Sequence, residues 1–269
     1  MRNSLPASPS FRWRTVALPA EHGGWAMLFG PILLGLLVAP SLPAVFLALV
    51  YVAAFLARTP LRIISKNRQR GRRTSRTAAA TKMFGIYVFI IVFAVSGVLV
   101  TGGTLPLVPA IFALPFAGAL LYFDLHATSR RLLPELIAPA VLSTSVAGMV
   151  LAAGWDWPHT MAIWSIPLMA SLPEVLFVRA RLRLDRGLPA HTAIAIAAHI
   201  LAALIAVVLV RAGLLPSLAG MAILVLLGRA LYGLSSYRRV MSIKTLGWSE
   251  IGFSLLVVLF SAAGYWSTG

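Results

Sequence analysis

The feature that most constrains this fold is a series of long runs that contain no charged residue. A helix that crosses a bilayer needs about 20 mostly apolar residues. The uncharged run from Met83 to Phe123 therefore has room for two such helices, and the Gly- and Pro-containing turn Thr101–Pro106 divides it. The run from Gly23 to Ala57 is divided in the same way at Ala39–Pro43.

Dividing every run in this way predicts nine transmembrane helices and an all-α, polytopic membrane protein. Hydrophobic residues make up 59% of the chain and charged residues only 11%, a balance too apolar for a soluble domain. We expect a cytoplasmic N-terminal segment over 1–20, one transmembrane domain over 21–269, and a basic cytoplasmic loop over 59–82. The predicted helices are 22–39, 43–58, 83–101, 105–123, 134–153, 161–178, 190–210, 214–233 and 249–267.

The basic residues gather in alternate connections of this nine-helix arrangement. Of the 23 Lys and Arg residues, 22 fall in the N-terminal segment and in the connections 58–82, 124–133, 179–189 and 229–244, and only Arg211 falls elsewhere. Because cytoplasmic loops of membrane proteins carry an excess of Lys and Arg, these segments and the N-terminus are predicted to be cytoplasmic. The C-terminus is predicted to lie outside, and the membrane to be the bacterial inner membrane.

The net charge of +16 is explained by this orientation without a nucleic-acid partner. The basic run Ser65–Arg76 lies between two spans, so contact with anionic lipid head groups is its simpler role. The chain has no cysteine, which excludes disulfides and thiolate metal sites. Its N-terminus lacks the apolar core of a cleavable signal peptide.

Six of the seven acidic residues fall at the predicted cytoplasmic helix ends. Glu21, Glu135 and Glu250 each open a predicted helix, where a carboxylate is favoured by unpaired N–H groups. Glu174 is different, because it stands inside an apolar helix and should face a partner or a watery cavity. His199, within the seventh helix, is predicted to be a hydrogen-bonded interior histidine, since nothing near it has metal-ligand spacing.

An arginine motif repeats four helices apart. Arg58 and Arg62 follow the second helix, and Arg179 and Arg183 follow the sixth, each pair in the pattern R-x-x-L-R. Residues four apart share a helix face, so each pair could clamp a carboxylate or phosphate. The first and fifth helices also open alike, with Pro19 and Glu21 in one and Pro134 and Glu135 in the other. These echoes predict a duplicated four-helix unit followed by one last helix.

The opening of the first helix carries a family resemblance. Pro19-x-Glu21-His22-Gly23-x-Trp25-Ala-Met27, followed by Pro31 and Gly35 and then by Arg58-Thr-Pro-Leu-Arg62, resembles the YwiC-like family of bacterial membrane proteins. This resemblance covers most of the chain and implies a multi-pass membrane protein. It implies no particular reaction.

A more distant resemblance is to the UbiA superfamily of intramembrane prenyltransferases. The Tyr122–His126 stretch, the number of helices and the pseudo-repeat are similar to that superfamily. The resemblance implies Asp-rich, Mg²⁺-binding motifs after the second and sixth helices, since Mg²⁺ needs oxygen ligands. Here those places carry the two arginine pairs instead. We therefore expect an anion site without metal, and no transfer of the prenyltransferase mechanism.

Two functional hypotheses and a third alternative follow from these residues. The first is a protein that binds or modifies an anionic, prenyl- or lipid-like amphiphile at the cytoplasmic interface. Its head group would be held by the arginine pairs, with counter-charge from acids and a histidine: Arg58, Arg62, Arg179, Arg183, Glu21, His22 and Glu174. No cofactor, metal or catalytic residue is predicted. The second is an anion transporter with helices interrupted by Pro31, Pro60, Pro115, Pro139, Pro167 and Pro173. A non-catalytic membrane assembly protein is the third.

Overall fold

The computed structural model describes residues 14–18, 22–71, 74–126 and 131–268, and every regular element in these ranges is helical. Glu21 and the N-terminal residues before Arg14 lie outside the described residues. The helices of the first half are α1 (Arg14–Ala17), α2 (His22–Val38), α3 (Leu42–Gln69), α4 (Ser75–Gly102), the short 3-10 helix η1 (Leu105–Leu107), α5 (Val108–Leu125) and α6 (Leu132–Ala152). Those of the second half are α7 (Trp157–Leu184), α8 (Thr192–Arg211), α9 (Ser217–Leu234) and α10 (Ile243–Thr268).

The expected all-α, multi-pass architecture is confirmed. In the described part of the chain, 8 helices are long and apolar enough to cross a membrane, and α2 is a shorter apolar helix of 17 residues. Together these helices occupy the places of the nine that the sequence predicts.

Several helices begin and end for local reasons that the sequence supplies. Ser41 and Asp156 each accept a hydrogen bond from the backbone N–H three residues on, which caps α3 and α7. The turn after α4 includes Gly103, whose φ of 72° favours glycine. This is the Gly- and Pro-containing turn that divides the long uncharged run of the sequence.

The helix ends correct three expectations. The segment 59–82 is mostly helical rather than a loop, because α3 continues to Gln69 and α4 already begins at Ser75. α10 begins at Ile243, so Glu250 lies in its third turn and does not open it. The prolines predicted to interrupt helices do not: Pro31, Pro60, Pro115, Pro139, Pro167 and Pro173 all lie inside helices. Tertiary packing tolerates such prolines where neighbouring groups satisfy the freed carbonyls.

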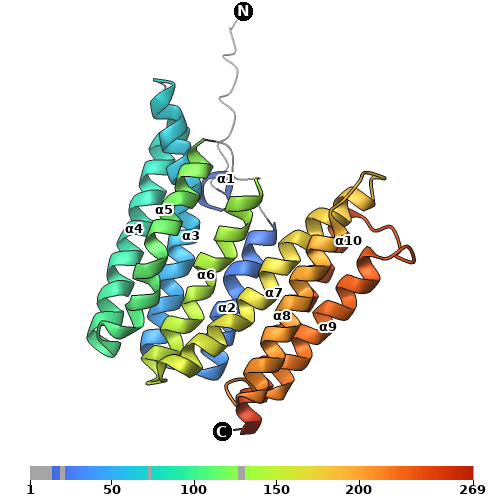
Figure 1. Ribbon diagram of the computed structural model, residues 1–269. Coiled ribbons are helices and arrows are strands. Elements are labelled where there is room, and N and C mark those ends of the chain that lie inside the picture. Colours follow the sequence, from blue (N-terminus) through green and yellow to red (C-terminus); the bar gives the residue numbers. More distant parts are fainter. Residues whose placement is uncertain (1–13, 19–21, 72–73, 127–130, 269) are drawn as a thin grey trace, which may run out of the picture.

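Six helices contact one another in a closed ring. Each contacts the next in the order α2, α6, α7, α8, α9, α10, and α10 returns to α2. Of the remaining long helices, α3 packs on the outside of α2 and α6, α5 packs on α6, and α4 packs on α3 (Figure 1). Since both α2 and α6 touch the outer helices and the ring, these two helices join the two parts of the molecule.

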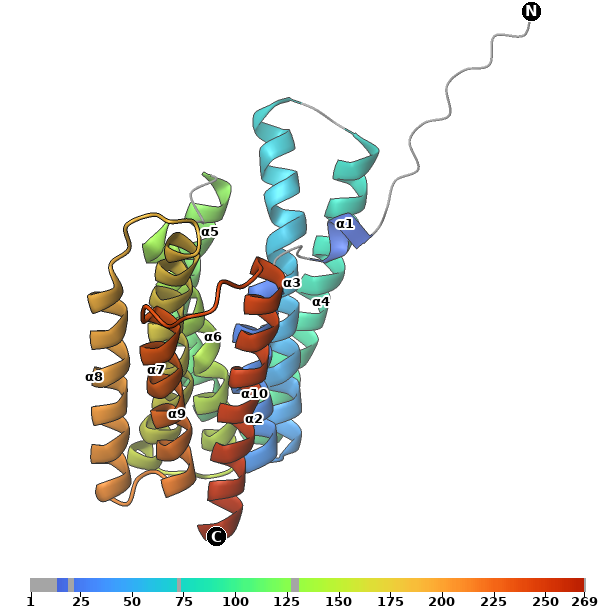
Figure 2. The same ribbon diagram turned by 90° about the vertical axis from the view of Figure 1, so that its right-hand side faces the viewer.

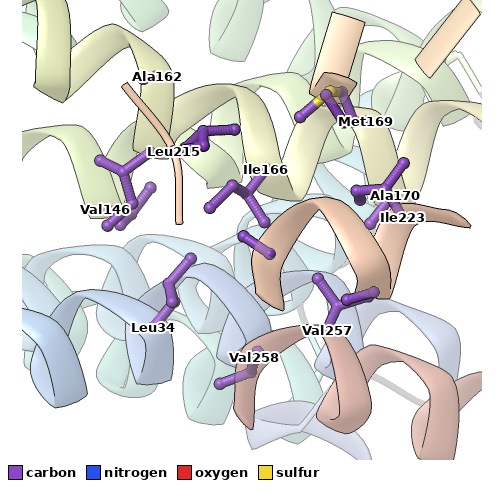
Figure 3. Close-up of a cluster of buried hydrophobic side chains, with 14 of the residues drawn as sticks. Leu34, Val146, Ala162, Ile166, Met169, Ala170, Leu215, Ile223, Val257 and Val258 are labelled. Atoms are coloured by element: carbon purple, nitrogen blue, oxygen red, sulfur yellow. The ribbon is translucent and has the colours of Figure 1, made fainter. Parts of the chain in front are cut away.

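An apolar core fills the ring, and Figure 3 shows its side chains pointing toward one another from several helices. Leu34 comes from α2, Val146 from α6, Ile166 from α7, Ile223 from α9 and Val258 from α10. All five are at most 4% exposed. In a bilayer such packing stabilises the bundle by close contact between helices more than by exclusion of water.

The two ends of the bundle differ in charge. The last residues of α3, α5, α7 and α9 lie at the end that also carries α1, whereas α10 ends at the other (Figures 1 and 2). The connections at the first end and the helix segments that adjoin them hold most of the Lys and Arg residues, among them Arg70, Arg131, Arg186 and Arg238. We call it the basic end. Arg211 lies at the end of α8, at the opposite end of the bundle.

Candidate functional site

The described residues place five of the seven predicted site residues near the basic end. Arg58 and Arg62 lie in the last third of α3, and Glu174, Arg179 and Arg183 lie in the second half of α7. Glu21 is outside the described residues. His22 is the first residue of α2, but its side chain is not among those described.

Arg58 binds a carboxylate of its own chain. Its Nε and Nη2 donate to Oδ2 of Asp124, over 2.9 and 2.6 Å. Asp124 is the last acid of α5 and its side chain is 1% exposed, whereas that of Arg58 is 27% exposed. The pair therefore fastens α3 to α5 at the basic end. Arg62, one turn further along α3, is half-buried.

The second arginine pair is engaged differently. Arg179 donates to Oε2 of Glu135 over 2.6 Å, which joins α7 to the first turn of α6. Arg183 points to the following connection and donates from Nε to the carbonyl of Pro189 over 2.7 Å. Both side chains are exposed. The two R-x-x-L-R motifs thus make contacts with different helices, and their role in binding an anion stays a prediction.

Glu174 lies near other ionisable side chains, as expected for a carboxylate inside an apolar helix. Its carboxyl group lies close to that of Glu250 on α10. Glu174 also lies within electrostatic range of Arg229 on α9. Glu174 is half-buried, whereas the side chain of Glu250 is 10% exposed. Two carboxylates from different helices therefore meet inside the ring.

Arg229 lies at the centre of this group. Its Nη2 donates to Oε2 of Glu250. Its guanidinium lies between two phenyl rings, with Cζ 4.1 Å from the centroid of Phe177 and 4.8 Å from that of Phe253. Its side chain is 8% exposed, and the buried Nη1 finds no hydrogen-bond partner among the described residues. Stacking on two rings stabilises the guanidinium while it leaves in-plane donors available.

His199 of α8 packs against the same cluster. Its Nδ1 lies 2.8 Å from the carbonyl oxygen of Ala195, which can only accept, so Nδ1 carries the proton. The other nitrogen, Nε2, is buried and has no partner in the described part of the chain. The ring meets Phe177 edge-on, 6.2 Å between centroids. The expectation of a hydrogen-bonded interior histidine is confirmed.

These four side chains form what we call the polar layer: Glu174, His199, Arg229 and Glu250. Each of the four lies on the same helix face as a buried core residue, one or two turns closer to the basic end. Glu174 follows the core residue Ala170 by four positions, and His199 precedes Ala202 by three, spacings that keep residues on one helix face. A second apolar cluster, which includes Ala180, Ala230 and Leu246, lies beyond the layer. The ionisable groups are thus held between two apolar layers.

Sequence reasoning found only part of this layer. It identified Glu174 by the cost of a carboxylate inside an apolar helix, but it counted Arg229 with a basic connection and Glu250 as a helix opening. In the structure Arg229 lies one turn inside α9 and Glu250 lies in the third turn of α10. The sequence did contain a signal, because Arg229 and Glu250 each lie within one or two helical turns of a long apolar run. A charged side chain in such a helix is too costly to face lipid and should face the interior of the bundle.

A buried network of charges fixes the helix ends beside the polar layer. Arg181, 3% exposed, donates to Asp185, to the carbonyl of Gly233 and to the carbonyl of Arg239. The other carboxylate oxygen of Asp185, Oδ1, lies 3.5 Å from Nε of Arg238. This network ties the end of α7 to the α9–α10 connection. All three nitrogens of the Arg181 guanidinium are paired, which is the arrangement expected for a structural role, whereas Oδ1 of Asp185 and Nε of Arg238 are buried without a hydrogen-bond partner among the described residues.

An apolar groove runs between α2 and α10. It has a volume of about 170 Å³ and is lined by Trp25, Ala26, Phe29, Gly30 and Leu33 from α2 and by Ile251, Ser254 and Leu255 from α10. Phe29, Leu33 and Leu255 keep more than a third of their surface exposed, so the groove is open on one side. Trp25 stacks on Phe29 and meets Phe55 edge-on. Gly24 allows Phe55 to approach, because a Cβ there would lie 3.0 Å from its ring.

The described residues contain no group of three or more His, Asp or Glu side chains placed to hold a metal ion. The chemistry that the region offers is therefore that of its cations, carboxylates and apolar groove.

Comparison with protein families identifies the first half of the molecule. The model of the family described as YwiC-like protein matches residues 18–150. Residues 18–150 thus belong to the YwiC-like family. The matched segment includes α2 with its side of the groove, the Arg58–Asp124 pair and most of α6. The polar layer lies wholly beyond it, on α7 to α10.

No curated protein and no solved structure matches the chain. The likeness to the UbiA superfamily and the four-helix pseudo-repeat therefore stay predictions from the sequence.

Proposed function

We propose that this YwiC-like membrane protein binds an anionic amphiphile at the basic end of its helical bundle. The hydrocarbon chain occupies the groove between α2 and α10, and the phosphate or carboxylate head lies among the cations of the basic end. The observation that carries this proposal is the groove itself, since its lining is almost wholly apolar and opens sideways where lipid would lie.

The predicted arginines supply the head-group contacts. Asp124 takes Nε and Nη2 of Arg58, and a guanidinium has five N–H donors, so an anion can add to Arg58 without breaking that pair. Arg62 follows on the same face of α3, and Arg179 and Arg183 stand exposed at the end of α7. Glu21, His22 and Glu174 provide counter-charge in this proposal. The surplus of cations favours an anionic head.

One observation favours transport as a second function. The polar layer places ionisable groups inside four helices, one to three turns from their ends, and such groups often mark an ion path. Substrate-dependent flux of an anion in sealed vesicles, lost when His199 is changed to Ala, would support transport. Absence of flux would leave binding as the function.

The groove can be tested by filling it. The protein is purified in mild detergent, and its bound amphiphiles are identified by native mass spectrometry and compared with the total lipid of the same membranes. Leu255→Trp places a larger ring in the groove. Leu259→Trp is the matched control, because Leu259 is exposed one turn further along α10 and does not line the groove.

We expect the wild type and the Leu259→Trp variant to retain an enriched amphiphile with an anionic head. The Leu255→Trp variant should retain about tenfold less, the ratio that corresponds to a loss of about 1.4 kcal/mol of binding free energy. Bound lipid of the same composition as the membrane, or equal retention by both variants, would refute the proposal. A neutral or zwitterionic enriched ligand would refute the role of the arginines.

A further inference from the structure

The polar layer carries an imbalance of charge. Glu174 and Glu250 bring two carboxylates, and Arg229 brings one guanidinium, within an otherwise apolar part of the bundle. If both carboxylates are ionised, the layer holds one unpaired negative charge. Such a charge is costly where the surroundings are apolar, so one further positive charge is required there.

Among the described side chains of the neighbouring helices, no Lys or Arg is paired with this second carboxylate. Toward Glu174 and Glu250, α8 presents His199, whose Nδ1 lies against the carbonyl of Ala195 and whose Nε2 makes no hydrogen bond to either carboxylate, and α9 presents Arg229, already counted. On α6, Glu135 is paired with Arg179 at the basic end, and on α7 Arg181 is paired with Asp185. From α2, the nearest ionisable residue of the helix is His22, whose side chain is not described.

A metal ion is a poor candidate for the missing charge. Two carboxylates are fewer than the six or so oxygen ligands that hard cations take, and the described residues include no group of three or more candidate ligands. A proton needs only two acceptors. The carboxyl groups of Glu174 and Glu250 lie close together, and a proton on one of them can donate a hydrogen bond to the other.

Two further observations mark the layer as a binding site rather than a closed ion pair. Nη1 of Arg229 and Nε2 of His199 are both buried, and neither has a hydrogen-bond partner among the described residues. A donor and an acceptor thus remain unsatisfied beside the carboxylates, whereas buried polar groups in folded proteins are nearly always paired.

We propose that Glu174 and Glu250 form an intramembrane proton-binding site that holds one proton against Arg229. When the proton binds, an O–H bond forms on one carboxylate and donates to the other. The pair then carries one negative charge instead of two, and Arg229 balances it. Glu174, the half-buried member, exchanges the proton with the basic end, and Glu250 stays paired with Arg229. This site shares no side chain with the lining of the apolar groove, although Glu174 also belongs to the proposed head-group site.

Infrared spectroscopy of the purified protein tests the site directly, because a protonated carboxyl has its own C=O stretching band, which shifts in D₂O. We expect the wild type to show one buried carboxylic acid band near neutral pH. Glu174→Gln should abolish it, since Glu250 then pairs alone with Arg229. Glu135→Gln, which removes a surface carboxylate from α6, should leave the band unchanged.

Thermal stability gives a second measurement on the same proteins. Raising the pH from about 4.3, the ordinary glutamate pKa, should lower the melting temperature of the wild type until the folded pair itself loses its proton, because over this range the unfolded chain has already released the proton that the folded pair still binds. Glu174→Gln keeps the shape of the side chain and the charge balance, so it should fold and its melting temperature should not show this fall.

Three results would overturn the proposal. The first is the absence of the band in the wild type, which would place the charge on His199 or elsewhere. The second is a band that persists in both Glu174→Gln and Glu250→Gln. The third is a band that disappears, with a rise in melting temperature, when sodium replaces choline, which would identify an alkali cation as the occupant.

Discussion

The ion pair between Arg58 and Asp124 is predicted to be asymmetric in its response to mutation. The side chain of Asp124 is 1% exposed, and that of Arg58 is 27% exposed. Arg58→Met leaves a carboxylate buried without its cation. Asp124→Asn keeps an acceptor for Arg58, whose guanidinium also reaches water. The two single variants should therefore lose different amounts of stability, although both break the same salt bridge.

The magnitudes follow from burial. Removing one partner of a buried pair costs about 3–5 kcal/mol, because the other charge is left uncompensated, and we assign this cost to Arg58→Met. Asp124→Asn replaces a charged acceptor by a neutral one, which costs about 1–2 kcal/mol. At about 2–4 °C per kcal/mol for a chain of this size, Arg58→Met should lower the melting temperature by about 6–20 °C.

The decisive measurement is the double variant. Melting temperatures are recorded in one detergent for the wild type, both single variants and Arg58→Met combined with Asp124→Asn. Adding Asp124→Asn to Arg58→Met should raise the melting temperature, because it removes the stranded charge. The control is Arg76→Met on α4, where the side chain is exposed. If the second substitution lowers stability further, or if Arg58→Met shifts no more than Arg76→Met, the reasoning from burial is refuted.

Two further predictions concern other sites. Gly233→Ala should lower the melting temperature, because the new Cβ would lie 2.7 Å from the ring of Phe177. Gly228→Ala on the same helix meets nothing within 4 Å, so it should raise the melting temperature through helix propensity. Equal effects of the two substitutions would show that the ring of Phe177 moves freely. Asp156→Ala should lower the melting temperature near neutral pH, because hydrogen bonds from the backbone and ring of His159 hold the pKa of Asp156 below its ordinary value. That stabilisation is complete above the ordinary aspartate pKa of about 3.9 and is lost as the pH falls through the lowered pKa, so the gap between variant and wild type should narrow in acid; a constant gap would contradict this.

The membrane architecture could be predicted because its signals are local. The length of the apolar runs, the turns at Ala39–Pro43 and Thr101–Pro106, and the one-sided distribution of Arg and Lys need no knowledge of packing. The ends of helices were less predictable. α3 and α7 extend past their apolar runs into charged sequence, and α3 still has Lys66 and Arg68 in its last turn, where cations favour the helix dipole.

The polar layer could not be predicted as a whole, because it depends on which helices close the ring. Glu174 was found from its own surroundings in the sequence. Arg229 and Glu250 lie near the ends of their helices, where a basic connection or an N-terminal carboxylate is an adequate explanation. Only the packing of α10 against α7 and α9 shows that these residues share one layer.

The groove and the polar layer meet on α10 without sharing a side chain. An α-helix turns about 100° per residue, so Leu255 points well away from Glu250, whereas Ser254, four residues after Glu250, lies near the same face and also lines the groove. A ring at position 255 should therefore expel an amphiphile without disturbing the carboxyl band, and Glu250→Gln should remove the band without changing the bound amphiphile. If either substitution alters both readouts, Ser254 is the contact through which the groove and the layer act on each other.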